Sequence, residues 1–302
     1  HLVHQAGGSG VKNRYGLKRG PIPRLQSFWD ARAACNFIGG GTGTGLIIVA
    51  GLYAALGQPV LVPTLLGLVA VAFGLFMVFM EIGRPWRSMN VFFNPQTSWM
   101  TREGIVALPL FFFGGVAVVL HGTALGNTAS VLAGLSAACY LYCQMRMLHA
   151  CKGILSWCEP ALKPYMMVTG VVEGLGVALC VPAVTGNKVA WSALAALLLL
   201  RALLWFGYAA ALHSNRAPED SRAEIDRLRW AYMLLGHLLP VLLLCLALLM
   251  ASGPPAILAG LLAASSGWYV KLMIITRAAQ TRGFAIPRTP VRGRGESRVL
   301  SS

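Results

Sequence analysis

Apolar runs long enough to cross a bilayer, about 18 to 25 residues each, recur along the whole chain and constrain its fold more than any other feature. Only 12% of the 302 residues are charged, about half the share found in soluble domains, so ionic side chains are too few to cover a soluble surface. Inside a bilayer every backbone polar group must be paired internally, which favours bundled helices. The sequence therefore predicts an all-α, polytopic integral membrane protein.

Eight transmembrane helices are expected, and the even number places both termini on one side. Their expected ranges are 31–56, 62–82, 103–121, 128–150, 164–184, 189–213, 230–251 and 255–277. A glycine-rich run at 39–45 in the first span has a counterpart at Gly170, Gly174 and Gly176 in the fifth, which is compatible with a four-plus-four repeat. We read these glycines as places where neighbouring backbones approach closely. The chain then divides into a basic N-terminal segment, a membrane domain and a basic C-terminal tail, at 1–27, 28–280 and 281–302.

Lysine and arginine are distributed very unevenly between the expected loops. The leading segment, the second, fourth and sixth loops and the tail hold nearly all of them, whereas the loops on the other side hold Lys188 alone. Positive residues are retained on the cytoplasmic side, so this asymmetry predicts an inner-membrane protein with both termini in the cytoplasm. The net charge of +15 then attracts anionic lipid headgroups, or docks an acidic soluble partner, and does not indicate a nucleic-acid surface.

The cysteines and histidines do not predict a metal centre in this chain. None of the seven cysteines has the C-x-x-C spacing typical of zinc or iron–sulfur ligation. A membrane b-type haem needs two imidazoles at matching depth on facing helices, and His237, inside the seventh span, has no obvious partner at its own depth. We therefore expect no metal ligands and no haem.

Three carboxylates fall in or at the edge of the spans, where an ionised group costs about 2.5–3.5 kcal/mol at the span centre. Glu81 ends the second span, opposes the helix dipole and needs a cation or a proton. Glu103 opens the third span after a capping Thr101, so the helix dipole can account for it. Glu173 lies near the midplane, and we expect it to form an ion pair with Arg201 of the sixth span, with a proton path as the alternative reading.

The second loop brings Glu81 and Glu103 to the same membrane edge, together with arginines and aromatic residues. Such a set suits a quinone, whose ring needs a flat apolar wall, hydrogen bonds to two carbonyls and an acid or base for the protons that accompany its electrons. Glu81 and Glu103 are the expected proton-transferring residues, and Arg84 is expected to tune their acidity. The other expected quinone-binding residues of this loop are Trp86, Trp99 and Arg102.

The same loop resembles a known family. It reads Glu81-Ile-Gly-Arg-Pro-Trp-Arg-Ser-Met-Asn90, then Phe92-Phe-Asn-Pro95, then Ser98-Trp-Met-Thr-Arg-Glu103. This segment resembles the corresponding loop in the membrane-anchor subunit of dimethyl sulfoxide reductase, within the wider DmsC/NrfD superfamily. Weaker similarities in the first span, at the end of the fourth span and in the fifth span extend the resemblance over about residues 28–280.

The resemblance implies a haem-free anchor that exchanges electrons with menaquinone or ubiquinone. Its implied partners are a four-cluster iron–sulfur subunit and a catalytic subunit with a molybdenum or tungsten bis-pterin cofactor. A His stands in the reductase anchor where this chain has Glu81, and that His and the Glu matched by Glu103 are linked to quinol handling. Asn36 matches a polar first-helix residue whose amide would hold a quinone carbonyl. The change at Glu81 leaves the direction of electron flow open.

The charge asymmetry puts the docking loops inside, whereas dimethyl sulfoxide reductase faces the periplasm. The resemblance then favours a cytoplasm-facing complex, with phenylacetyl-CoA:acceptor oxidoreductase as the preferred relative, and sulfite dehydrogenase or a dimethyl sulfoxide reductase-like complex as alternatives. The competing class is a secondary transporter. It is favoured by the possible four-plus-four repeat and by the charged residues Glu173 and Arg201 near the membrane midplane.

Overall fold

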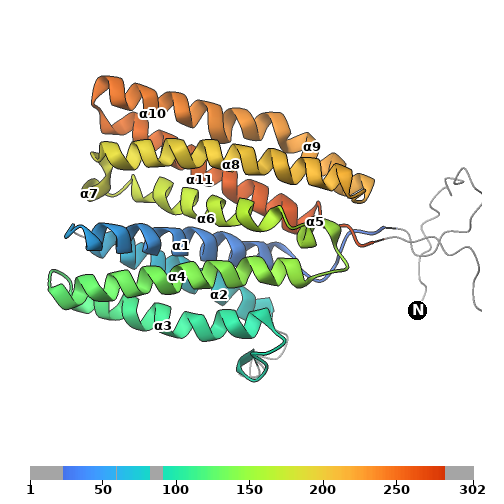
Figure 1. Ribbon diagram of the computed structural model, residues 1–302, viewed down its shortest axis with the longest axis horizontal. Coiled ribbons are helices and arrows are strands. Elements are labelled where there is room, and N and C mark those ends of the chain that lie inside the picture. Colours follow the sequence, from blue (N-terminus) through green and yellow to red (C-terminus); the bar gives the residue numbers. More distant parts are fainter. Residues whose placement is uncertain (1–22, 59, 82–90, 283–302) are drawn as a thin grey trace, which may run out of the picture.

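The computed structural model describes residues 23–58, 60–81 and 91–282. Over these residues the chain is a bundle of long helices that run side by side, with short turns at both ends (Figure 1). The β-structure in this part of the chain is limited to two isolated bridges, Leu25 with Gln280 and Ile154 with Thr281. The predicted class, an all-α polytopic membrane protein, is confirmed.

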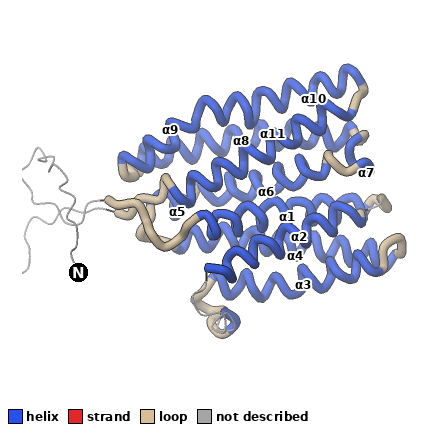
Figure 2. The backbone as a smooth tube through the Cα atoms, turned by 180° about the vertical axis from the view of Figure 1, so that it is seen from behind, coloured by secondary structure: helices blue, strands red, loops and turns tan. Residues whose placement is uncertain are grey.

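The long helices lie side by side along the bundle, which Figure 2 shows from the opposite side. They are α1 (Ala31–Ala55), α2 (Leu61–Glu81), α3 (Trp99–Val119), α4 (Ala124–Ala150), α5 (Leu155–Cys158), α6 (Leu162–Ala178), α7 (Pro182–Thr185), α8 (Lys188–Ser214), α9 (Glu219–Met233), α10 (Leu239–Met250) and α11 (Gly253–Thr276). A π-helical turn, Leu234–Leu238, joins α9 to α10 without a break.

Seven helical segments are long and apolar enough to cross a membrane, and they match seven of the eight expected spans. The remaining span, expected at 164–184, corresponds to α6, which has 17 residues and ends at Ala178. A turn follows, and Pro182 then begins the short helix α7. Because proline cannot continue a preceding helix, the apolar run in the sequence is longer than the helix that it forms. The count of eight spans therefore stays a prediction.

The pattern of helix neighbours occurs twice. In the first half, α1 packs on α2 and α4, and α3 packs on α4. In the second half, α6 packs on α8 and α11, and α10 packs on α11. The two halves meet where α1 lies against α6 and α11, in the middle of the bundle (Figure 1).

Glycines allow α1, α6 and α11 to pack closely, as the glycines of the first and fifth expected spans predicted. A Cβ atom on Gly174 would collide with the backbone of Gly45, and one on Gly45 would collide with the carbonyl of Gly170. The same relation holds between Gly176 of α6 and Gly260 of α11. Backbones packed this closely gain dispersion contacts that larger side chains would prevent.

We expect Gly174→Ala to lower the stability of the purified protein by about 1–3 kcal/mol, because the added methyl group overpacks the seam between α1 and α6. The measurement is thermal unfolding in detergent, followed by tryptophan fluorescence. The matched control is Gly207→Ala in α8, where a new Cβ meets no atom within 4 Å. Equal unfolding temperatures for the two variants would contradict the close seam.

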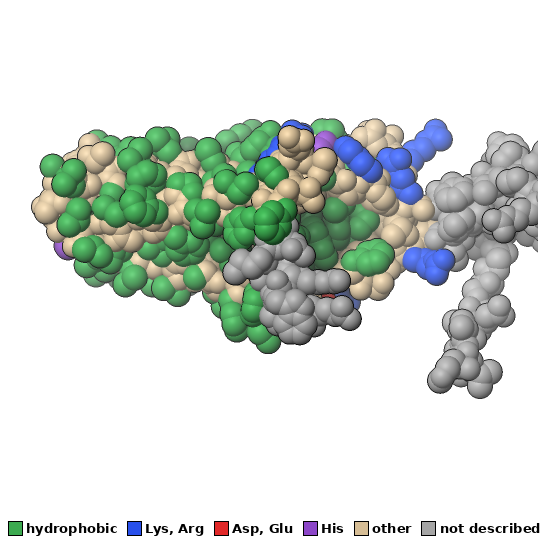
Figure 3. Space-filling view, turned by 90° about the horizontal axis from the view of Figure 1, so that it is seen from below, with side chains coloured by type: hydrophobic (Ala, Val, Ile, Leu, Met, Phe, Trp, Pro, Cys, Tyr) green, Lys and Arg blue, Asp and Glu red, His purple; other side chains and the backbone are tan. Residues whose placement is uncertain are grey.

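The charged side chains of the loops gather at one end of the bundle, which we call the basic end: the end where α1 begins and α11 stops. Figure 3 shows Lys and Arg side chains clustered there and a largely hydrophobic surface along the helices. Among the described residues, the opposite end carries a single Lys or Arg residue, Lys188. The Lys and Arg residues that the sequence assigns to one set of loops therefore lie at one end of the bundle.

Candidate functional site

An apolar cavity of about 410 Å³ lies between α1, α2 and α3 near the basic end. On the face seen in Figure 3, hydrophobic side chains line a hollow close to the clustered Lys and Arg residues. Its apolar wall includes Trp29, Phe37, Phe79, Phe92 and Phe111. The polar side chains in the wall are Asn36, Glu81 and Glu103. Cavities of about 300–1,000 Å³ with an apolar wall and a few polar groups are typical of small-molecule sites.

Three residues expected from the sequence thus meet at one cavity, each from a different helix. Asp30 caps α1 by accepting a hydrogen bond from the backbone N–H of Arg32, at 2.7 Å, which places Asn36 in the second turn. Glu81 is the last residue of α2. The Asp30 cap thus fixes where α1 begins, and so fixes the depth of Asn36.

The start of α3 corrects the interpretation of Glu103. We expected the helix to begin at Glu103 after a capping Thr101, but it begins at Trp99, and Ser98 is the cap, accepting from the N–H of Thr101 at 3.2 Å. Glu103 therefore lies a full turn inside the helix and is 3% exposed. The favourable dipole of the first turn falls off at that depth, so it does not account for this carboxylate.

The Glu103 carboxyl faces Asn36 of α1 and Tyr140 and Gln144 of α4. The Gln144 side chain is held in place, since its Nε2 donates to the backbone oxygen of Asn36 at 3.1 Å. Within the described residues, one oxygen of each of these four side chains is buried without a hydrogen-bond partner. These four polar side chains face one another, and two of them, Asn36 and Glu103, also line the cavity, where the polar atoms of a ligand or of water would complete their hydrogen bonds.

Tyr140 and Gln144 were missed at the level of sequence. Both are completely buried, and they lie one helical turn apart on α4. The available signal was the spacing of four residues between Tyr140 and Gln144, which places the two polar side chains on one helix face. Gly40 makes room for Gln144, since a Cβ there would overlap the Gln144 amide.

Glu81 has the positive neighbour that its position requires. Arg32 of α1 donates from Nη1 to the backbone oxygen of Met80 at 2.9 Å, directly before Glu81. The same guanidinium pairs with Asp30 at 2.8 Å. Arg32 thus partly neutralises the C-terminal end of α2, where a carboxylate alone would be unfavourable.

Two other expected residues lie beside the cavity and not in its wall. The Trp99 ring is flanked by the guanidinium groups of Arg102, at 4.1 Å, and Arg146, at 4.4 Å. Arg102 also donates to the backbone oxygens of Pro95, at 2.7 Å, and Gln96, at 2.8 Å. Both residues therefore brace the segment that enters α3. The remaining two, Arg84 and Trp86, fall outside the described residues.

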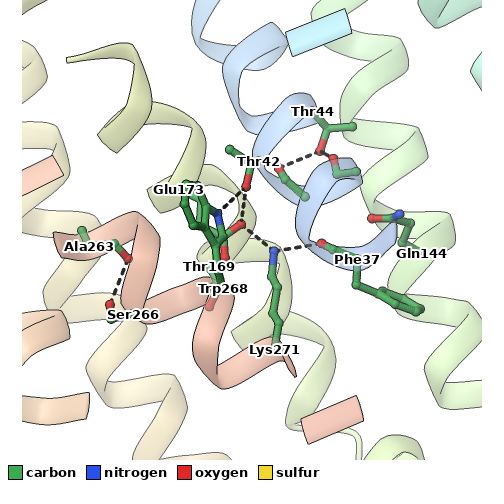
Figure 4. Close-up of polar contacts among 12 residues, drawn as sticks. Phe37, Thr42, Thr44, Gln144, Thr169, Glu173, Ala263, Ser266, Trp268 and Lys271 are labelled. Atoms are coloured by element: carbon green, nitrogen blue, oxygen red, sulfur yellow. Dashed lines mark hydrogen bonds and ion pairs between the residues drawn. The ribbon is translucent and has the colours of Figure 1, made fainter. Parts of the chain in front are cut away.

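A second polar centre lies on the other side of α1 (Figure 4). The expected ion pair between Glu173 and Arg201 is wrong: Glu173 Oε2 lies 2.7 Å from Lys271 Nζ of α11, and both side chains are completely buried. The same Glu173 oxygen accepts from Thr42 Oγ1 at 2.9 Å, and Lys271 also donates to the backbone oxygen of Phe37 at 3.1 Å.

Glycines explain why this pair forms. A Cβ on Gly41 would overlap the Lys271 ammonium group, and one on Gly267 would lie 2.6 Å from Glu173 Oε1. Among the cations inside the expected spans, only Arg201 was considered as a partner for Glu173, and Lys271 in the last apolar span was passed over. The glycines on the facing helices were the missed signal that room existed for two large side chains.

Arg201 is completely buried as well and has different partners. Its Nε donates to His237 Nε2 at 3.1 Å, and its two terminal nitrogens donate to the backbone oxygens of Ala263, at 2.9 Å, and Gly236, at 2.5 Å. His237, for which the sequence offered no second imidazole at its own depth, is thus a hydrogen-bond partner of Arg201. The bond to Gly236 falls within the π-helical turn, where the normal helical ladder is interrupted.

Over the part of the chain that the structure describes, no three His, Cys, Asp or Glu side chains gather closely enough to hold a metal ion. No model of a known protein family matches the chain. No curated protein matches it at a significant level.

Proposed function

We propose that this chain is the membrane-anchor subunit of a cytoplasm-facing molybdenum or tungsten oxidoreductase, and that it exchanges electrons between a partner iron–sulfur subunit and quinone. The observation that supports this proposal is the cavity at the basic end, where Asn36, Glu81 and Glu103 meet in an apolar, aromatic wall. A quinone ring needs this combination of a flat apolar wall, hydrogen-bonding groups and proton-exchanging acids.

Each wall residue has a definite task in this proposal. Phe37 and Phe79 would pack against the apolar ring, and the Asn36 amide would bind one carbonyl oxygen. Glu103, buried and flanked by Tyr140 and Gln144, would transfer a proton to or from the ring oxygen, and Glu81 would connect the site with water at the membrane edge. The basic end would face the cytoplasm, because its positive charge would be retained on that side.

The proposed partners follow from the resemblance to the DmsC/NrfD superfamily. They are a four-cluster iron–sulfur subunit docked at the basic end and a bis-pterin catalytic subunit bound to it. Phenylacetyl-CoA:acceptor oxidoreductase is the preferred complex, with sulfite dehydrogenase or a dimethyl sulfoxide reductase-like complex as alternatives. The substrate is chosen by the catalytic subunit.

Purification of the tagged, full-length chain from its native membrane under anaerobic conditions tests this proposal. We expect iron, sulfide and either molybdenum or tungsten to copurify in stoichiometric amounts, and decylubiquinone to quench tryptophan fluorescence because Trp29 lines the cavity. A chain that purifies alone and does not bind decylubiquinone would refute the proposal.

A further inference from the structure

A second cavity, of about 300 Å³, lies between α8 and α9 at the basic end. Among the described residues, none lines both this cavity and the one between α1, α2 and α3. A cavity with one apolar side and one charged side suits an amphipathic ligand. Its apolar wall includes Trp205, Phe206 and Ile225, and its polar side chains are those of His213, Asp226 and Arg229.

This cavity crosses the level at which the helices enter the apolar part of the bundle. Arg229 is the last Lys, Arg, Asp or Glu of the continuous helix that runs from α9 into α10. Trp230 follows it and is 76% exposed, and tryptophan is enriched where membrane helices meet the headgroup layer. On α8, Trp205 lies nine residues before the last residue, Ser214, or about 13 Å deeper at 1.5 Å per residue. The cavity therefore extends from the headgroup layer toward the hydrocarbon, which is the space that a phospholipid fills.

The Arg229 guanidinium is held in place and is open to an anion. It lies 5.8 Å from the centre of the Phe206 ring and 5.3 Å from that of the Trp230 ring, within the range of cation–π attraction. No carboxylate lies within 4 Å of it among the described residues. An arginine in this state suits a phosphate group, to which it can donate two parallel hydrogen bonds.

Asp226 adds a negative group to the same rim. It lies three residues before Arg229 on α9, so the two side chains are neighbours on one helix face. His213 Nε2 lies 3.1 Å from Asp226 Oδ2, but a carboxylate has about four acceptor positions and can accept further hydrogen bonds. The complementary headgroup therefore carries both a phosphate and a cation with N–H groups. Phosphatidylethanolamine has this headgroup, whereas phosphatidylglycerol lacks the cation and phosphatidylcholine lacks the N–H groups.

We propose that the cavity between α8 and α9 binds one molecule of phosphatidylethanolamine. Arg229 binds the phosphate, Asp226 accepts a hydrogen bond from the ammonium group, and an acyl chain packs against Phe206. The Trp205 indole N–H is buried without a hydrogen-bond partner among the described residues, and an ester carbonyl oxygen of the lipid would accept from it. This inference does not depend on the quinone cavity, so either proposal can fail without the other.

The test uses the full-length chain, purified in detergent, stripped of lipid and mixed with equal amounts of the three phospholipids with identical acyl chains. Native mass spectrometry then counts the lipids that stay bound. We expect phosphatidylethanolamine to be retained first. Phosphatidylglycerol is the stringent competitor, because the basic end attracts anionic lipid without a specific site.

Three variants of α9 locate the site. Arg229→Gln should lower retention of phosphatidylethanolamine about tenfold, because it removes the charged partner of the phosphate. Asp226→Asn should keep phospholipid binding but lose the preference for phosphatidylethanolamine over phosphatidylglycerol. The matched control is Arg227→Gln, which removes the same charge from a residue that pairs with Glu224 and lies outside the cavity wall. Added phosphatidylethanolamine should also raise the unfolding temperature of the unsubstituted protein and of Arg227→Gln, but not that of Arg229→Gln.

Several results would overturn the inference. They are preferred retention of phosphatidylglycerol or phosphatidylcholine, no retained lipid, or an equal loss in Arg227→Gln and Arg229→Gln. An unchanged preference in Asp226→Asn would overturn the role of this carboxylate in recognising the ammonium group. Arg229→Lys guards against a general effect of substitution at this position, since it keeps the positive charge and should retain most of the binding.

Discussion

Glu103→Gln is expected to lower quinone turnover by the assembled complex at least a hundredfold, while oxidation of the substrate with an artificial dye continues. Glutamine has nearly the same shape but cannot exchange a proton, and general acid–base groups contribute roughly 10²–10⁴-fold to rate. In the proposed complex, dye-linked activity would bypass the cavity, because the dye would take its electrons from the partner subunits. The measurement is steady-state turnover of the purified complex with decylubiquinone and with the dye in parallel.

A second test variant and a control variant complete the Glu103→Gln experiment. Glu81→Gln should also abolish quinone turnover if this acid carries protons between the site and water. The matched control is Glu224→Gln, which alters a carboxylate paired with Arg227 on α9 and away from the cavity. Unchanged quinone turnover in Glu103→Gln would reject the proton role of the buried acid, and a similar loss in Glu224→Gln would indicate a general effect of carboxylate removal.

Lys271→Met is expected to destabilise the protein by about 3–5 kcal/mol, because it leaves the Glu173 carboxylate buried without its cation. Lys271→Met/Glu173→Gln removes both charges and should recover most of the lost stability. The measurement is unfolding in mixed detergent micelles, followed by circular dichroism. If the single and double variants unfold alike, the pair does not contribute as an ion pair.

The sequence predicted the fold class well, because apolar length and the distribution of Lys and Arg are set by the membrane and not by tertiary detail. It placed the end of the fifth segment too far along the chain, because the apolar run continues beyond Ala178 but the helix α6 does not. The apolar character of a segment indicates that it lies in lipid or protein, but it does not indicate where a helix ends. The turn before Pro182 depends on the local backbone conformation.

The site was predicted in part. Glu81, Glu103 and Asn36 do share one cavity, although Asn36 was selected by resemblance and not by composition. Tyr140 and Gln144 were missed because which face of α4 points toward α1 depends on helix packing. The partner of Glu173 was wrong for the same reason: depth along a helix can be estimated from residue number, but rotation about the helix axis cannot.

The central position of α1 bears on how the protein is made. In its most apolar stretch 78% of the residues are buried by other helices, against 28% for α2 and α3. Yet α1 is the first of the described helices to be synthesised, and its neighbours α6 and α11 emerge much later. During biogenesis, α1 therefore has to remain at the insertion machinery, or packed against α2 alone, until α6 and α11 are inserted. Its many glycines and its small lipid-facing surface make it a poor free-standing transmembrane helix.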